Sequence, residues 1–177
     1  MDRAQALSVF QRIFGGKRHR AALAPLYAAI VARGRDPFWY REGGVPDTID
    51  GRFDMVAAVT ALVLLRLEDA GEAAREPSVL LTELFIDDMD ASLRQIGIGD
   101  YVVGKHLGRM VSALGGRLTA FRAAKADERY AEAVRRNIFH ESPPSEAAVA
   151  LVAERLRDFA AALERADATA LIAGTLP

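Results

Sequence analysis

Apolar residues recur every three or four positions along most of the chain, and strict alternation of apolar and polar residues is nearly absent. This spacing predicts an all-α protein. The helices we expect cover residues 2–14, a stretch around 26–31, 50–70, 77–95, 100–114, one or two helices within 117–139, and 145–165. Asp50 is the expected N-cap of the third of these helices, because a short acceptor there can bind free amides of the first turn.

Glycine and proline mark the expected helix boundaries. The pair at residues 115–116 predicts a break between two helices. Pro25 is expected in the first turn of its helix, where a missing amide hydrogen is tolerated. One long ordered loop is expected over residues 36–50, and it carries the aromatic residues Phe38, Trp39 and Tyr40. Ordered loops of this length are usually functional or packed on themselves.

The length and composition predict a single compact multi-helix domain. The chain has 177 residues, of which 51% are hydrophobic, and its formal net charge is −1. We expect a basic amphipathic helix and turn in residues 1–20, a helical core in 21–141, and a C-terminal amphipathic helix packed on the same domain in 142–177. The absence of cysteine excludes disulfides, thiolate zinc sites and iron–sulfur ligation. The longest uncharged apolar run, residues 55–65, is too short to span a bilayer, and no signal-peptide pattern is present, so a cytoplasmic protein is expected.

Charge is distributed unevenly along the chain. Residues 1–20 contain five Lys and Arg against one Asp, whereas residues 42–100 contain thirteen Asp and Glu against four Arg. The basic head suggests contact with an anionic membrane or with ribosomal RNA. A first helix packed on the core beside an exposed basic turn is the favoured alternative. Binding to DNA is not expected, because the middle of the chain is acidic.

No pattern indicates catalysis or a cofactor. Asp87-Asp88-Met89-Asp90 resembles the aspartate-rich magnesium motif of isoprenoid synthases, but the carboxylate that motif needs one turn later is missing. The three histidines lie far apart in the sequence. We therefore expect no enzyme activity, no metal and no cofactor. A small helical metal-dependent enzyme using the Asp clusters remains an alternative, as does a membrane-peripheral adaptor acting through residues 1–20.

A series of ordered motifs resembles the ubiquinol–cytochrome c chaperone family. The motif with most matching positions is residues 44–55, GVPDTIDGRFDM. Upstream lie Leu26-Tyr27, Ile30-Val31 and the aromatic trio. Downstream lie Asp87-Asp88-Met89-Asp90, Leu93-Arg94, Gly97-Ile98-Gly99-Asp100, Val103-Gly104-Lys105 and Gly116-Arg117. The resemblance covers about residues 21–125 and looks like that of a bacterial member.

The resemblance implies an all-α assembly factor for complex III of the respiratory chain that catalyses no reaction. Mitochondrial members bind newly made cytochrome b, together with a small partner protein near the ribosomal tunnel exit. The expected partners are therefore apo-cytochrome b or other complex III subunits, with a small partner protein and the ribosome exit region as further candidates. The expected location is the cytoplasmic face of the inner membrane, with residues 1–20 as a possible membrane contact.

Two groups of candidate site residues follow. An acidic, aromatic surface could recognise the positively charged loops of a membrane client, and its predicted members are Phe38, Trp39, Tyr40, Val45, Pro46, Asp87, Asp88 and Asp90. For the aromatic trio, a loop pinned to its own core is an equally weighted alternative. The motif residues expected to support the fold are Asp47, Asp50, Arg52, Phe53, Asp54, Arg94, Gly97, Gly99, Asp100, Gly104 and Lys105. Among these, at least two of Arg52, Asp54, Arg94 and Asp100 are expected in buried ion pairs.

Overall fold

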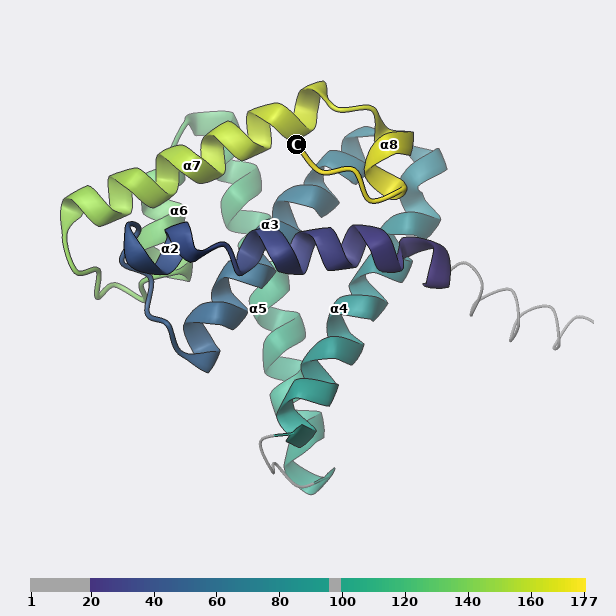
Figure 1. The fold of residues 1–177 in the computed structure, drawn as a ribbon, viewed down its shortest axis with the longest axis horizontal. Coiled ribbons are helices and arrows are strands. Elements are labelled where there is room, and N and C mark those ends of the chain that lie inside the picture. Colours follow the sequence, from purple (N-terminus) through teal and green to yellow (C-terminus); the bar gives the residue numbers. More distant parts are fainter. Residues whose placement is uncertain (1–19, 96–99) are drawn as a thin grey trace, which may run out of the picture.

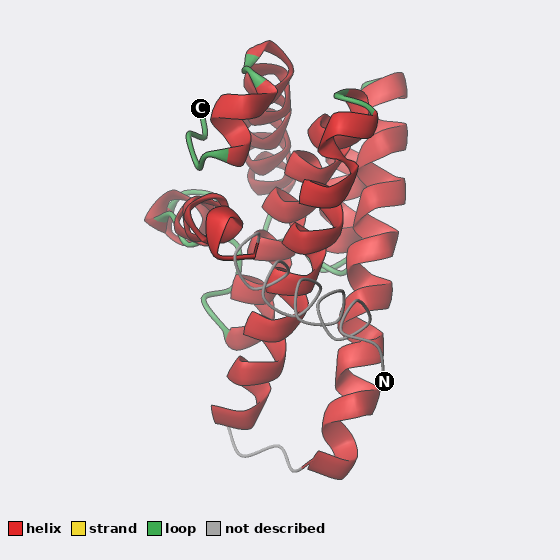
Figure 2. Cartoon of the chain, turned by 90° about the vertical axis from the view of Figure 1, so that its right-hand side faces the viewer, coloured by secondary structure: helices red, strands yellow, loops and turns green. Residues whose placement is uncertain are grey.

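The helices predicted from apolar spacing are present in the computed structural model, which describes residues 20–95 and 100–177, without the side chains of residues 93–107 and 127. Every regular element in that part of the chain is a helix (Figures 1 and 2). After a helix over residues 20–34 come α2 (Pro37–Arg41), α3 (Ile49–Asp69), the short 3-10 helix η1 (Glu72–Ala74), α4 (Arg75–Gln95), α5 (Asp100–Asp127), α6 (Tyr130–Asn137), α7 (Glu146–Arg165) and α8 (Ala168–Ile172). The all-α prediction is confirmed, while the helix expected over residues 2–14 lies outside the described residues.

Helix α3 forms the centre of the fold. Fourteen of its 21 residues are buried, and it contacts α4, α5 and α7. Burial on nearly all sides is typical of a helix in the core of a domain. The expected N-cap, Asp50, is two residues too late: the N-cap is Thr48, whose hydroxyl oxygen accepts a hydrogen bond from the amide of Gly51 at 3.1 Å. Asp50 lies in the first turn, where its negative charge interacts favourably with the helix dipole.

Helices α4 and α5 lie side by side as a long pair whose far ends extend beyond the other helices (Figures 1 and 2). The break expected at Gly115 and Gly116 is wrong, because α5 continues through both glycines for 28 residues. Helix α5 contacts α3, α4 and α6. Packing of this kind outweighs the low helix propensity of glycine, which costs about 1 kcal/mol per residue.

The chain reverses after α5 and returns over the core as α6 and α7. Glu128 has a positive φ of 56°, which ends α5. The boundary expected near Ser145 is confirmed, since its side chain accepts the amide of Ala148 at 3.1 Å and α7 follows. The buried stripe of α7 contains Val149, Val152, Leu156, Phe159 and Leu163. It packs against α6 and α3 (Figure 1).

Three local expectations need correction. Pro25 lies more than one turn inside the helix over residues 20–34 and not in its first turn. Helix α4 begins at Arg75, two residues before the expected Pro77; the proline still falls in the first turn, where amides need no intrahelical acceptor. The expected loop 36–50 contains the five-residue helix α2. No described helix has the length and apolar character needed to cross a membrane.

Candidate functional site

The aromatic segment is fixed to the core through its middle residue, Trp39. This side chain is only 1% exposed, and its indole N–H donates to the carbonyl oxygen of Arg33 at 2.7 Å. The Asp36 carboxylate accepts the amide of Phe38 at 3.0 Å and thereby caps α2. The amide of Val45, itself buried, donates to the Trp39 carbonyl at 2.9 Å. The segment is therefore pinned to its own core at Trp39, which presents no surface to a partner.

Phe38 and Tyr40 flank the buried tryptophan and are only half-buried. The guanidinium carbon of Arg155 on α7 lies 4.7 Å from the centroid of the Phe38 ring, in a cation–π contact. The Tyr40 hydroxyl donates to the Gly34 carbonyl at 2.7 Å, and burial raises its pKa to about 12. Pro46 is exposed. Parts of Phe38, Tyr40 and Pro46 therefore reach the surface.

The aspartates of α4 make contacts with the helix over residues 20–34. Arg20 forms an ion pair with Asp87 and lies 3.7 Å from a carboxylate oxygen of Glu83. The Tyr27 hydroxyl donates to Asp88 at 2.8 Å, and burial raises the pKa of this phenol, helped by its contact with the Asp88 carboxylate. Asp90 is half-buried. Part of the predicted acidic surface therefore braces two helices against each other.

One side of α4 nevertheless carries exposed negative charge. Glu76, Val79, Glu83 and Asp87 are exposed at spacings of three and four residues, which place them along one side of the helix. The Asp87 side chain is 61% exposed even though it pairs with Arg20, and Val79 is 56% exposed. We call these four residues the acidic face of α4. It combines carboxylates with one exposed apolar side chain.

Asp54, in the motif of residues 44–55, lies at the centre of a buried polar cluster. It is 3% exposed and forms an ion pair with Arg117 of α5, which is equally buried. His140 Nε2 lies 2.7 Å from the second Asp54 carboxylate oxygen. The Arg117 guanidinium also donates to the Asn137 carbonyl at 2.7 Å. Burial raises the pKa of Asp54 in spite of the Arg117 charge, and the cluster joins α3 and α5 to the segment after α6.

The sequence identified only part of this cluster. The apolar spacing around Arg117 does not distinguish it from a surface arginine, although it ends the Gly116-Arg117 motif of the resemblance. The sequence predicts no role for His140, because the three histidines lie far apart and lack neighbouring ligand patterns; in the structure its partner Asp54 is 86 residues away. Phe53, half-buried, completes the cluster with its ring 5.5 Å from the Arg117 guanidinium carbon. Only the fold brings these residues together.

The other predicted residues lie at the surface or outside the part of the chain that the structure describes. Arg52 is exposed, and its Nε donates to Asp47 at 2.6 Å, which lowers the pKa of that carboxyl. Arg52 is therefore not in a buried pair. Asp50 is exposed. Gly97 and Gly99 lie outside the described residues, and so do the side chains of Arg94, Asp100 and Lys105 and the surroundings of Gly104. The roles assigned to these residues remain predictions.

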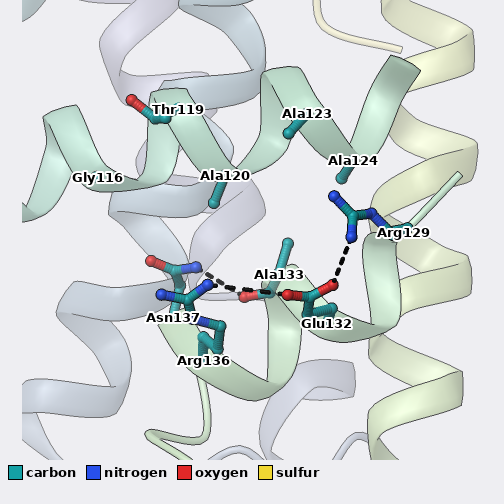
Figure 3. A pocket seen from close by; sticks show the side chains of 10 residues that line it. All are labelled: Gly116, Thr119, Ala120, Ala123, Ala124, Arg129, Glu132, Ala133, Arg136 and Asn137. Atoms are coloured by element: carbon teal, nitrogen blue, oxygen red, sulfur yellow. Dashed lines mark hydrogen bonds and ion pairs between the residues drawn. The ribbon is translucent and has the colours of Figure 1, made fainter. Parts of the chain in front are cut away.

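A groove between α5 and α6 did not emerge from the sequence. It has a volume of about 540 Å³. Its lining is shown in Figure 3 and consists of Gly116, Thr119, Ala120, Ala123, Ala124, Arg129, Glu132, Ala133, Arg136 and Asn137. Glu132 lies between two arginines, 3.4 Å from Arg129 and 3.8 Å from Arg136. The small residues come from α5 and α6, and the charged side chains all come from α6 and the residue before it.

Among residues 20–92, 108–126 and 128–177, where side chains are described, no three His, Asp or Glu side chains are positioned to share a metal ion. Asp87, Asp88 and Asp90 belong to this part of the chain. In this motif Asp87 pairs with Arg20 and Asp88 accepts a hydrogen bond from Tyr27.

Comparisons with known proteins agree with the motifs. A family model described as ubiquinol–cytochrome c chaperone matches residues 41–176. The crystal structure of the Cbp3 homolog from Brucella abortus is similar to the whole fold, with a TM-score of 0.79 and 28% sequence identity over 97% of this chain and 94% of that one. None of the curated proteins matches the chain.

Proposed function

The chain belongs to the ubiquinol–cytochrome c chaperone family, and from this premise we propose that it binds newly made cytochrome b and promotes assembly of complex III without catalysing a reaction. The observation that carries the proposal is the match of the family model over residues 41–176. The fold shared with the Brucella abortus protein along nearly the whole chain supports it. Binding of a client needs exposed surface of suitable chemistry, and the described residues offer two such areas.

The acidic face of α4 is the first proposed client contact. Membrane proteins carry an excess of Lys and Arg in their cytoplasmic loops, and these loops are exposed before assembly. Carboxylates at Glu76, Glu83 and Asp87 attract such loops and raise the rate of encounter. The exposed Val79 adds an apolar contact in the same row. Of the aspartates predicted from the sequence, Asp87 is exposed enough to contact a client. Asp88 instead accepts a hydrogen bond from Tyr27 and thereby helps to hold α4 against the helix over residues 20–34.

The exposed parts of Phe38, Tyr40 and Pro46 form the second proposed contact. Aromatic side chains supply much of the affinity of protein interfaces, and a segment that is already ordered loses little entropy on binding. Trp39 and Val45 act from beneath by fixing the segment, through the hydrogen bonds at Trp39. In this proposal, some of the predicted client-binding residues touch the client, and the others hold those residues in position.

The place of action follows from the client. Cytochrome b is a membrane protein, so we place the chaperone at the cytoplasmic face of the inner membrane, with residues 1–20 as the membrane contact. A small partner protein and the ribosome exit region are further proposed contacts, carried over from the mitochondrial members of the family.

Site-specific photo-crosslinking in the native host tests this proposal. A photoreactive residue replaces Asp87 in one strain, Phe38 in a second and Thr119, in the α5–α6 groove, in a third. Asp158 on α7 is the matched control, because its side chain is 66% exposed against 61% for Asp87. We expect cytochrome b to be captured from Asp87 and Phe38, more strongly when haem insertion is blocked, and not from Asp158.

Two outcomes would contradict the proposal in different ways. Capture of cytochrome b from Thr119 alone would move the client surface to the α5–α6 groove and refute the contacts named above. Failure to capture cytochrome b or any other complex III subunit from all three positions would refute the client itself.

A further inference from the structure

A basic hollow lies where the helix over residues 20–34, α2 and the start of α3 meet. Its volume is about 340 Å³. The residues that line it are Arg35, Pro37, Tyr40, Arg41, Asp47 and Arg52. Three of the six side chains are guanidinium groups and one is a carboxylate, so the lining carries a formal charge of about +2 at neutral pH. This charge is opposite in sign to the acidic face of α4.

Two of the three arginines form no pair with another described residue. Arg52 is paired, since its Nε donates to Asp47 Oδ1 at 2.6 Å. Within the described residues, neither the Arg35 nor the Arg41 side chain forms a hydrogen bond or an ion pair. Like charges held close together without counter-ions repel one another. Their presence at one hollow therefore leaves binding capacity for an anion.

The wall of the hollow is fixed before any ligand arrives. Tyr40 is held by the hydrogen bond from its hydroxyl to the Gly34 carbonyl at 2.7 Å. The Trp39 anchor beside it and the Asp36 cap hold the short helix that carries Arg41. Arg35 and Arg52 line the same hollow as Tyr40. A preformed wall reduces the entropy that a ligand loses on binding.

From this geometry we propose that the hollow binds a phosphate-class oxyanion through Arg35, Arg41 and Arg52, with Tyr40 as its apolar wall. The guanidinium fork matches the oxygens of phosphate with two parallel hydrogen bonds. A ligand with one carboxylate needs only one arginine, as the pairing of Asp47 with Arg52 shows. The two unpaired arginines supply the charge that a phosphate dianion requires. The same chemistry is present in a free phosphate and in the phosphate of a lipid headgroup.

Two binding experiments on the full chain test the proposal and separate the sources. Isothermal titration with inorganic phosphate measures the free anion. Flotation with phosphatidylcholine vesicles, with and without phosphatidylglycerol, measures the lipid phosphate. The test variants are Arg35→Gln, Arg41→Gln and the double variant. Arg109→Gln on α5 is the control, since Arg109 is exposed and forms no ion pair or hydrogen bond among the described residues and its replacement also removes one positive charge.

We expect each single variant to lose about tenfold in affinity for phosphate, the loss typical of one charge-assisted hydrogen bond. The double variant should lose phosphate binding and should bind vesicles less than the control, since residues 1–20 remain as a separate proposed membrane contact. The control should bind like the wild type. Phosphate binding identifies a small-anion site, and binding only to phosphatidylglycerol vesicles identifies a lipid site; either result supports the proposal when the variants reduce it. Because the Arg35 and Arg41 side chains form no hydrogen bond or ion pair with described residues, thermal unfolding should change little in all variants.

Three results would overturn the proposal: no binding of either probe, equal binding by the double variant and the control, or binding of poly-glutamate without binding of phosphate. None of these bears on the client, which is tested by crosslinking at Asp87 and Phe38. The hollow and the chaperone function can therefore fail separately.

Discussion

Asp54 of α3 and Arg117 of α5 form an ion pair inside the core, although 63 residues separate them in the sequence. Their side chains are only 5% and 4% exposed. His140 Nε2 and the Asn137 carbonyl oxygen also contact the pair, while Arg117 Nε is buried without a hydrogen-bond partner among the described residues. The pair thus connects the central helix to α5 and to the turn that leads into α7. It provides a reason for an aspartate and an arginine in the signature regions that does not involve the client.

Removal of one partner of this pair should lower the free energy of unfolding substantially. Arg117→Ala leaves Asp54 buried without its counter-charge, which typically costs about 3–5 kcal/mol. Urea denaturation followed by circular dichroism measures the loss. Arg122→Ala is the control, since Arg122 forms an exposed pair with Glu68 at 2.6 Å and such pairs contribute about 0–1 kcal/mol. Equal stability of the two variants would contradict the structural role of Arg117.

Tyr40 should make the fold sensitive to alkaline pH. Its phenol has a pKa of about 12 in the fold against 10.0 in the unfolded chain, because burial opposes the charged form. The contribution to stability is complete below pH 10.0 and is lost as the pH rises towards about 12. Urea unfolding across this range should show a smaller loss for Tyr40→Phe than for the wild type. A phenol that titrates near 10 in the ultraviolet difference spectrum of the two proteins would refute the prediction.

Trp39, the only tryptophan of the chain, reports on the aromatic segment. A side chain 1% exposed should give blue-shifted fluorescence that acrylamide quenches poorly. Trp39→Ala should cost about 3–5 kcal/mol, as for other buried aromatics. Trp39→Phe keeps most of the packing and removes the hydrogen bond to Arg33, so we expect a smaller loss, of about 1–2 kcal/mol. Ready quenching in the native protein would show that Trp39 is accessible after all.

Two glycines in helices should respond to alanine in opposite ways. A Cβ at Gly51 would lie 2.0 Å from the Pro46 carbonyl oxygen, a contact that forces the loop before α3 to move. Gly51→Ala should therefore destabilise the fold by about 1–3 kcal/mol. A Cβ at Gly115 has no neighbour within 4 Å, so Gly115→Ala should stabilise α5 by about 0.5–1 kcal/mol. Thermal unfolding of the two variants measures both effects, and a stabilising Gly51→Ala would contradict the close approach.

The sequence predicted the helices well where apolar spacing and end signals agreed. The expected starts and ends at Ser145 for α7 and near residue 70 for α3 agree with the structure, because capping is a local event. The break at Gly115 and Gly116 was wrong because tertiary contacts, which local propensity does not contain, carry α5 through both residues. The cap is Thr48 and not Asp50. Both side chains can accept a hydrogen bond from a first-turn amide, and the local sequence pattern does not distinguish between them.

The functional surface was less predictable, because it depends on which side of a helix faces the core. Phe38, Trp39 and Tyr40 are three consecutive aromatic residues, yet only Trp39 is buried. Asp87 and Asp88 are adjacent, yet one pairs with Arg20 at the surface and the other accepts from Tyr27. His140 and Arg117 join Asp54 only through the arrangement of α3, α5 and the turn after α6.

The most direct test of the central claim is the amount of assembled complex III in a deletion strain of the native host. Native gel electrophoresis and the reduced-minus-oxidised spectrum of cytochrome b measure it, with another respiratory complex as the internal control. The account predicts loss of complex III and of the cytochrome b signal, restored by the wild-type gene, while the control complex is unchanged. Normal complex III in the deletion strain would contradict the account.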